Sequence, residues 1–147
     1  MGGTVAAGVG LAAATAGVIA LAALRRRWVV VTVEGESMAP TYADGDRVLV
    51  RRVGADAVRA GQVVVVERPE VRRCVIKRAV AVPGDPVPVD RVPLLGSGPE
   101  RRVPEGMLVL LGDNAEDSYD SRRAGYFPAA RLVGVVARRL GVGVSRR

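Results

Sequence analysis

Short runs rich in valine recur along most of the chain, and they constrain its fold more than any other feature of the sequence. Glycine, proline and aspartate lie between the runs, in stretches such as ADGD, VPGDP and LLGSGPE. Valine favours extended backbone, whereas the intervening residues favour turns. The pattern therefore predicts a mainly β domain, an antiparallel barrel or sandwich with no long helix after residue 24. The runs lie at 28–33, 47–52, 62–67, 74–82, 107–112 and 132–139.

Residues 2–24 contain no charged side chain, and this stretch predicts one transmembrane helix that precedes the β domain. Its length is sufficient to cross about 30 Å of hydrocarbon. A cleaved secretory signal is the alternative, but such a signal begins with a charged region and ends at a small-residue cleavage site, and neither is evident here. We therefore divide the chain into an anchor with a basic flank at 1–27, a β-domain at 28–140 and a basic tail at 141–147.

The composition excludes several classes of site. The chain has no histidine and one cysteine, Cys74, so an imidazole or thiolate metal site and a Ser-His-Asp triad are both ruled out. We expect neither a metal nor a cofactor. The net charge is +7, but the arginines form scattered doublets and aromatic residues are scarce, which does not suggest a nucleic-acid partner. A basic surface close to anionic membrane lipid is the interpretation we favour.

Lys77 is the one lysine among the 22 basic residues of the chain. A guanidinium cannot lose its proton in a protein, whereas an amine can become neutral when it is buried or placed near positive charge. Lys77 lies in an apolar run beside Val75 and Ile76, so burial of this strand would lower its pKa. In a chain without histidine, a neutral Lys77 is the candidate general base.

Three motifs lie at the ends of the predicted strands, and their order carries a resemblance. Together they resemble the motifs of the type I signal peptidase (leader peptidase) family, which are serine proteases with a Ser-Lys dyad. The resemblance covers roughly residues 28–138. It implies a β-domain of the signal-peptidase type and no cofactor. The motifs are Ser37-Met38-Ala39-Pro40-Thr41 followed by Gly45-Asp46, Lys77-Arg78 followed by Pro83-Gly84-Asp85, and Gly112-Asp113-Asn114 followed by Ser118, Asp120, Ser121 and Arg122.

The resemblance also implies a role for each matching residue. Ser37 is the nucleophile, its backbone N–H is an oxyanion donor, and Lys77 is the general base. Ser118 matches the serine that hydrogen-bonds to the lysine and orients it. The remaining matches support the site: Asp120 and Arg122 correspond to an ion pair, and Asp113 and Asn114 belong to the same loop.

The expected substrate is a preprotein or propeptide that binds in an extended conformation, with small side chains in shallow pockets. Met38 and Gly35, on either side of the nucleophile, are the candidate pocket residues, with a place in the core as the alternative for Met38. Some relatives place a serine hydroxyl at the position of Gly35 as a second oxyanion donor, and glycine cannot supply one. The motifs therefore do not identify the second donor.

The resemblance predicts a membrane-bound endopeptidase that cleaves signal peptides after small residues. Its catalytic domain would lie outside the cytoplasm, although Arg25–Arg27 would favour the cytoplasmic side by the positive-inside rule. The main alternative is a specialised maturation peptidase of the same family, of the nickel superoxide dismutase type, acting in the cytoplasm. A self-cleaving regulator of the LexA/UmuD type and a catalytically inactive binding module are more distant alternatives.

Overall fold

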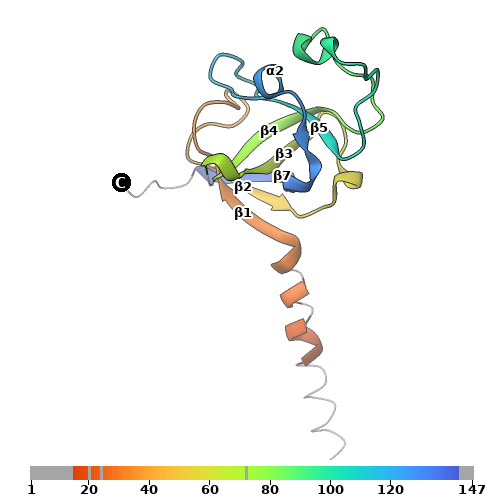
Figure 1. The fold of residues 1–147 in the computed structure, drawn as a ribbon. Coiled ribbons are helices and arrows are strands. Elements are labelled where there is room, and N and C mark those ends of the chain that lie inside the picture. The colour runs from red at the N-terminus through yellow and green to blue at the C-terminus, as the bar shows by residue number, and fades with distance from the viewer. Residues whose placement is uncertain (1–14, 20, 24, 72, 143–147) are drawn as a thin grey trace, which may run out of the picture.

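The computed structural model describes residues 15–19, 21–23, 25–71 and 73–142. Residues 15–19, 21–23 and 25–27 are helical and exposed, and this helical segment projects away from the β domain in Figure 1. No helix among the described residues is long and apolar enough to cross a membrane. The first half of the predicted anchor, residues 1–14, lies outside the described residues.

Seven strands form one antiparallel sheet in the order β1-β2-β7-β3-β4-β5-β6. The predicted mainly β antiparallel fold is therefore confirmed, and the six valine-rich runs correspond to six of these strands. The strands are β1 (Trp28–Thr32), β2 (Asp46–Arg51), β3 (Val63–Arg68), β4 (Arg73–Ala81), β5 (Met107–Leu111), β6 (Phe127–Pro128) and β7 (Leu132–Val142).

The central strands are covered on both faces, and β3 shows this most clearly. Val63 to Val66 are all buried, although successive side chains of a strand point to opposite faces. Val64 and Val66 pack with Leu108 and Leu110 in one cluster, while Val63 and Val65 pack with Met38 and Ile76 in another. This two-sided burial explains why the sequence shows a continuous run of valines instead of an alternating pattern.

The remaining elements are single turns of helix. They are η1 (Ala55–Ala57), η2 (Pro69–Val71), η3 (Pro93–Ser97), η4 (Ala129–Arg131) and α2 (Ser121–Ala124). The Pro/Gly-rich stretch from 87 to 104 folds as a loop that contains η3, and a bridge between Pro86 and Arg102 joins its two ends. It packs over a third apolar cluster that includes Val92, Leu95 and Val109.

One edge of β1 and part of one edge of β4 have no partner strand among the described residues. Among the residues that the structure describes, β1 pairs with β2 alone. β4 pairs with β3 along 73–78, but its pairing with β5 begins only at Arg78. Residues 73–77 of β4 therefore have one unpaired side within the described structure. The turn that follows β1 and the last residue of this unpaired stretch carry the two side chains described next.

Candidate active site

Ser37 and Lys77 are 40 residues apart in sequence, and the fold brings their side chains into direct contact. Ser37 lies in the turn between β1 and β2, and Lys77 lies on β4. The Lys77 Nζ atom donates a hydrogen bond to Ser37 Oγ over 2.7 Å. Lys77 is 3% exposed, and Ser37 is half-buried. A hydroxyl nucleophile and an amine are thus in hydrogen-bonding distance, and the amine is shielded from water.

The surroundings of Lys77 favour its neutral form. Burial is the largest cause, because the charged ammonium loses its hydration there. The negative charge of Asp120 opposes this effect, whereas the positive charges of Arg68 and Arg122 add to it. Together they lower the pKa of Lys77 from 10.5 to about 8. An amine with this pKa is partly neutral near physiological pH and can accept a proton.

The turn that carries Ser37 is held by core packing and by backbone hydrogen bonds. Met38 has no accessible surface and packs with Val33 and Ile76 in the core. Its carbonyl accepts a hydrogen bond from Tyr42 N–H over 2.9 Å. On the other side, Asn114 N–H donates to the Ser37 carbonyl oxygen over 3.0 Å. These contacts hold the nucleophile at a defined position relative to β4.

This burial corrects the interpretation of Met38 as a pocket wall. A side chain with no accessible surface cannot contact a substrate in this conformation, so Met38 supports the turn instead. Gly35 is exposed and has a positive φ of 80°, a backbone conformation that glycine adopts without strain. Its N–H donates to Asp44 Oδ1 over 2.7 Å. The Gly35 N–H is therefore engaged in a turn and is not a free oxyanion donor.

Asp120 is completely buried and binds Arg122 through two hydrogen bonds. The Nε atom of Arg122 donates over 3.0 Å, and its Nη2 atom donates over 2.5 Å. Asp120 also accepts from Gly112 N–H over 2.8 Å and from Arg122 N–H over 3.1 Å, which caps α2. Burial alone would raise the pKa of Asp120, but these hydrogen bonds hold it below its ordinary value. The ion pair implied by the resemblance is thus present and well satisfied.

Ser118 does not make the hydrogen bond to Lys77 that the resemblance implies. Its hydroxyl is buried and makes no hydrogen bond of good geometry to any described residue, Lys77 included. It lies close enough to Asp120 to help lower the pKa of that carboxyl. In this conformation Lys77 is therefore oriented by Ser37, and the expected hydrogen bond from Ser118 is absent among the described residues.

Gly112 lies between Ser118 and the turn of Ser37. A Cβ atom on Gly112 would stand 2.5 Å from the Ser37 carbonyl oxygen and closer still to Ser118 Oγ. The Ser37 carbonyl is backbone and is held by the hydrogen bond from Asn114 N–H, so it cannot move aside for this atom. Glycine is required here by close packing, and this requirement was not evident from the motif itself.

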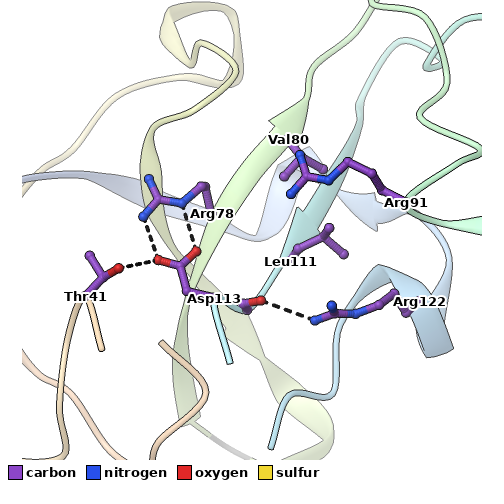
Figure 2. A pocket seen from close by; sticks show the side chains of 8 residues that line it. Thr41, Arg78, Val80, Arg91, Leu111, Asp113 and Arg122 are labelled. Carbon is purple, nitrogen blue, oxygen red and sulfur yellow. Dashed lines mark hydrogen bonds and ion pairs between the residues drawn. The ribbon is translucent and has the colours of Figure 1, made fainter. Parts of the chain in front are cut away.

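Asp113 joins two other parts of the site, as Figure 2 shows. It accepts two hydrogen bonds from Arg78, over 2.8 Å to Oδ1 and 2.6 Å to Oδ2, and a third from Thr41 Oγ1 over 2.6 Å. Hydrogen bonds from Arg78 lower its pKa. Because Thr41 ends the Ser37 turn and Arg78 follows Lys77, this cluster ties the nucleophile segment to the base segment. A pocket of about 460 Å³ lies beside it.

The sequence did not assign a role to Arg78 or Thr41, although both lie within the quoted motifs. The available signal was their position in the chain, because Arg78 directly follows Lys77 and Thr41 lies four residues after Ser37. Arg78 points to the opposite face of β4 from Lys77, because neighbouring side chains of a strand alternate. No cluster of metal-ligating side chains occurs among the residues that the structure describes.

The comparisons with known proteins agree with this geometry. The model of a family described as "Signal peptidase, peptidase S26" matches residues 6–99 and 93–140 of the chain. Together these two ranges include every catalytic candidate and most of the sheet.

Several curated proteins are similar to the chain. A probable signal peptidase I-1 of Synechocystis sp. is 28% identical over 128 residues, which cover 69% of the chain and 65% of that protein. A signal peptidase I of Leptolyngbya laminosa is 30% identical over 129 residues, with 69% and 63% covered. A signal peptidase IB of Staphylococcus aureus is 30% identical over 142 residues, with 72% and 74% covered. The chain thus spans slightly less than two thirds of the first two relatives.

Proposed function

Because the chain belongs to the signal peptidase family, peptidase S26, we propose that it is a membrane-bound serine endopeptidase that removes N-terminal signal peptides after small residues. The hydrogen bond between Lys77 and Ser37 carries this proposal, together with the burial of the amine. The curated relatives are named as signal peptidases, which supports the same substrate class. The helical stretch before β1, with residues 1–14, would form the membrane anchor.

The proposed reaction uses Lys77 as a base and then as an acid. The neutral amine accepts the proton of Ser37 Oγ while this oxygen attacks the scissile carbonyl carbon. The resulting ammonium returns the proton to the leaving amine, and the peptide C–N bond breaks. This step leaves an ester on Ser37. A water molecule, deprotonated by Lys77, then hydrolyses the ester and releases the signal peptide.

The negative charge on the carbonyl oxygen requires donors at the moment of attack. The Ser37 N–H is a suitable one, because it makes no hydrogen bond within the described residues. Gly35 cannot add a hydroxyl, and its N–H is bound to Asp44. The proposed site therefore has one protein donor from this turn, and we expect a slower reaction than in relatives with a serine at this position.

The unpaired strand edges support binding of an extended substrate. The free edge of β1 ends five residues before Ser37, and the unpaired stretch of β4 ends at Lys77. A peptide strand that adds to such an edge gains backbone hydrogen bonds and is carried past the dyad. Small residues before the scissile bond would fit, because the turn around Ser37 is closely packed.

Cleavage of a purified preprotein tests the activity. We expect the wild-type protein to release a mature product whose new N-terminus follows an Ala-x-Ala sequence, as identified by mass spectrometry. Ser37→Ala should release none while keeping its thermal unfolding transition. An intact preprotein after prolonged incubation with folded wild-type protein would contradict the proposal.

The basic segment Arg25–Arg27 favours a second candidate, a maturation peptidase of the same family whose catalytic domain lies in the cytoplasm. A reporter that is active only outside the cytoplasm, fused to the C-terminus, distinguishes the two. Activity of this reporter supports general signal-peptide removal. Activity of a cytoplasmic reporter alone supports the maturation role.

A further inference from the structure

Arg68 is a half-buried cation that lies on the same face of the sheet as Lys77. In the antiparallel register of β3 and β4, Val64 faces Lys77, Val66 faces Val75 and Arg68 faces Arg73. These pairs involve every second residue of each strand, so all of these side chains point to the same face of the sheet. Arg68 is four residues from the Val64 position, about 13 Å along the strand. Long side chains such as arginine and lysine can span most of this separation.

An aromatic ring from the site loop holds the Arg68 side chain in place. Its guanidinium carbon lies 4.6 Å from the centre of the Tyr119 ring, a distance typical of a cation–π contact. Tyr119 lies between Ser118 and Asp120 in sequence, so its position depends on the same loop that surrounds the dyad. The ring therefore restrains a positive charge close to the buried amine.

Within the described part of the chain, no carboxylate forms an ion pair with Arg68. Its neighbour Glu67 points to the opposite face of β3, and Glu70 pairs with Arg131 over 2.8 Å. The Arg68 side chain thus contacts an uncharged ring, and its charge acts on Glu70 without forming an ion pair with that carboxylate.

The other charges that face Lys77 partly cancel. Asp120 and Arg122 form a close ion pair, so their opposite effects on the amine partly offset each other. Ser37 and Ser118 contribute only hydroxyl groups. Arg68 is the remaining charge near the amine, and its positive sign lowers the Lys77 pKa. The electrostatic balance at the base consequently depends on a residue outside the three motifs.

We propose that Arg68, restrained by Tyr119, is a positioning residue of the dyad that favours the neutral amine of Lys77. The effect is electrostatic and needs no contact between Arg68 and the substrate. This inference rests on the proposed role of Lys77 as the base, but the ionisation of Lys77 can be measured without any substrate. Failure of the inference and failure of the proposed function are therefore distinguishable.

The single lysine of the chain makes this measurement direct. Protein labelled with carbon-13 at the lysine ε position gives one lysine signal, which reports the protonation of Lys77. We expect the wild-type signal to titrate with a midpoint of about 8, and Arg68→Gln to raise the midpoint by about half a pH unit. Tyr119→Leu should raise it less, and Tyr119→Phe should leave it unchanged because the ring is kept.

Arg138→Gln is the matched control. It also removes one positive charge, from an exposed position on β7, and it should leave the midpoint unchanged. A midpoint for Arg68→Gln within about 0.1 unit of the wild type would overturn the inference. An equal rise in Arg138→Gln would do so as well, because it would reduce the effect to net charge.

The pH dependence of cleavage gives a second reading. At pH 7, Arg68→Gln should cleave about threefold more slowly than the wild type, since a half-unit rise leaves about one third as much neutral amine. The two rates should converge above pH 9, and Arg68→Lys should restore the wild-type profile. A rate reduced equally at every pH would mean a structural role and contradict the inference. A shifted lysine signal in a protein that cleaves no preprotein would contradict the proposed function alone.

Discussion

Cleavage by this protein should depend on pH in a way that follows from the burial of Lys77. The base acts as a neutral amine, so the rate should rise with pH through the Lys77 pKa of about 8. About one tenth of the amine is neutral at pH 7 and about nine tenths at pH 9, so kcat/KM should increase about tenfold and then level off. At pH 7, the neutral form of an amine with the ordinary pKa of 10.5 would be about 300-fold less populated than that of an amine with a pKa of 8.

The assay is kcat/KM for an internally quenched peptide with an Ala-x-Ala site, measured in detergent micelles from pH 6 to pH 10. The peptide should contain no ionisable side chain, so that the profile reports the free enzyme. Lys77→Arg, measured at each pH, corrects for background hydrolysis. A rate that still rises about tenfold per pH unit between pH 9 and pH 10 would refute the reasoning, and so would a flat profile between pH 6 and pH 9.

Three further predictions concern the packing around the dyad. Gly112→Ala should reduce kcat/KM by more than about tenfold in the peptide assay, because its Cβ would displace the Ser37 turn. Asp120→Ala should lower the free energy of unfolding by about 3–5 kcal/mol in urea titrations, since it leaves the Arg122 guanidinium without its buried partner. Lys77→Met should raise the free energy of unfolding at pH 7 by roughly 2–3 kcal/mol, because the buried ammonium of the wild type disfavours folding. This gain should vanish as the pH rises from 8 to 10.5. In this range Lys77 is neutral in the folded wild type and still protonated in the unfolded chain, so the wild type becomes more stable. An unchanged value for any of these variants would contradict the corresponding contact.

The strands were largely predictable because valine-rich runs between turn residues have few other interpretations. The elements that were not predicted are short. β6 has two residues and α2 has four, so neither is long enough to show a hydrophobic period. The continuous apolar run of β3 also left open which faces of the sheet are buried, and only the packing of both faces resolves this.

The dyad was predictable from the motifs, whereas the contacts that support it were not. Pairing between Asp113 and Arg78, or between Arg68 and Tyr119, joins residues 35 and 51 positions apart, and no local pattern in the sequence indicates such pairs. The complete burial of Met38 and the lack of a hydrogen bond between Ser118 and Lys77 were not expected for the same reason. Both features depend on how closely the loops around the dyad pack.

The most direct test of the account is the cleavage rate of Lys77→Arg at pH 8 with the peptide substrate. The guanidinium keeps the positive charge but cannot become a base, so kcat/KM should fall by at least about a thousandfold. Lys77→Met, which is uncharged and fits a buried site, should show the same loss with a cooperative unfolding transition, which separates loss of the base from misfolding. A Lys77→Arg protein that cleaves within about tenfold of the wild-type rate would contradict the claim that Lys77 is the general base for Ser37.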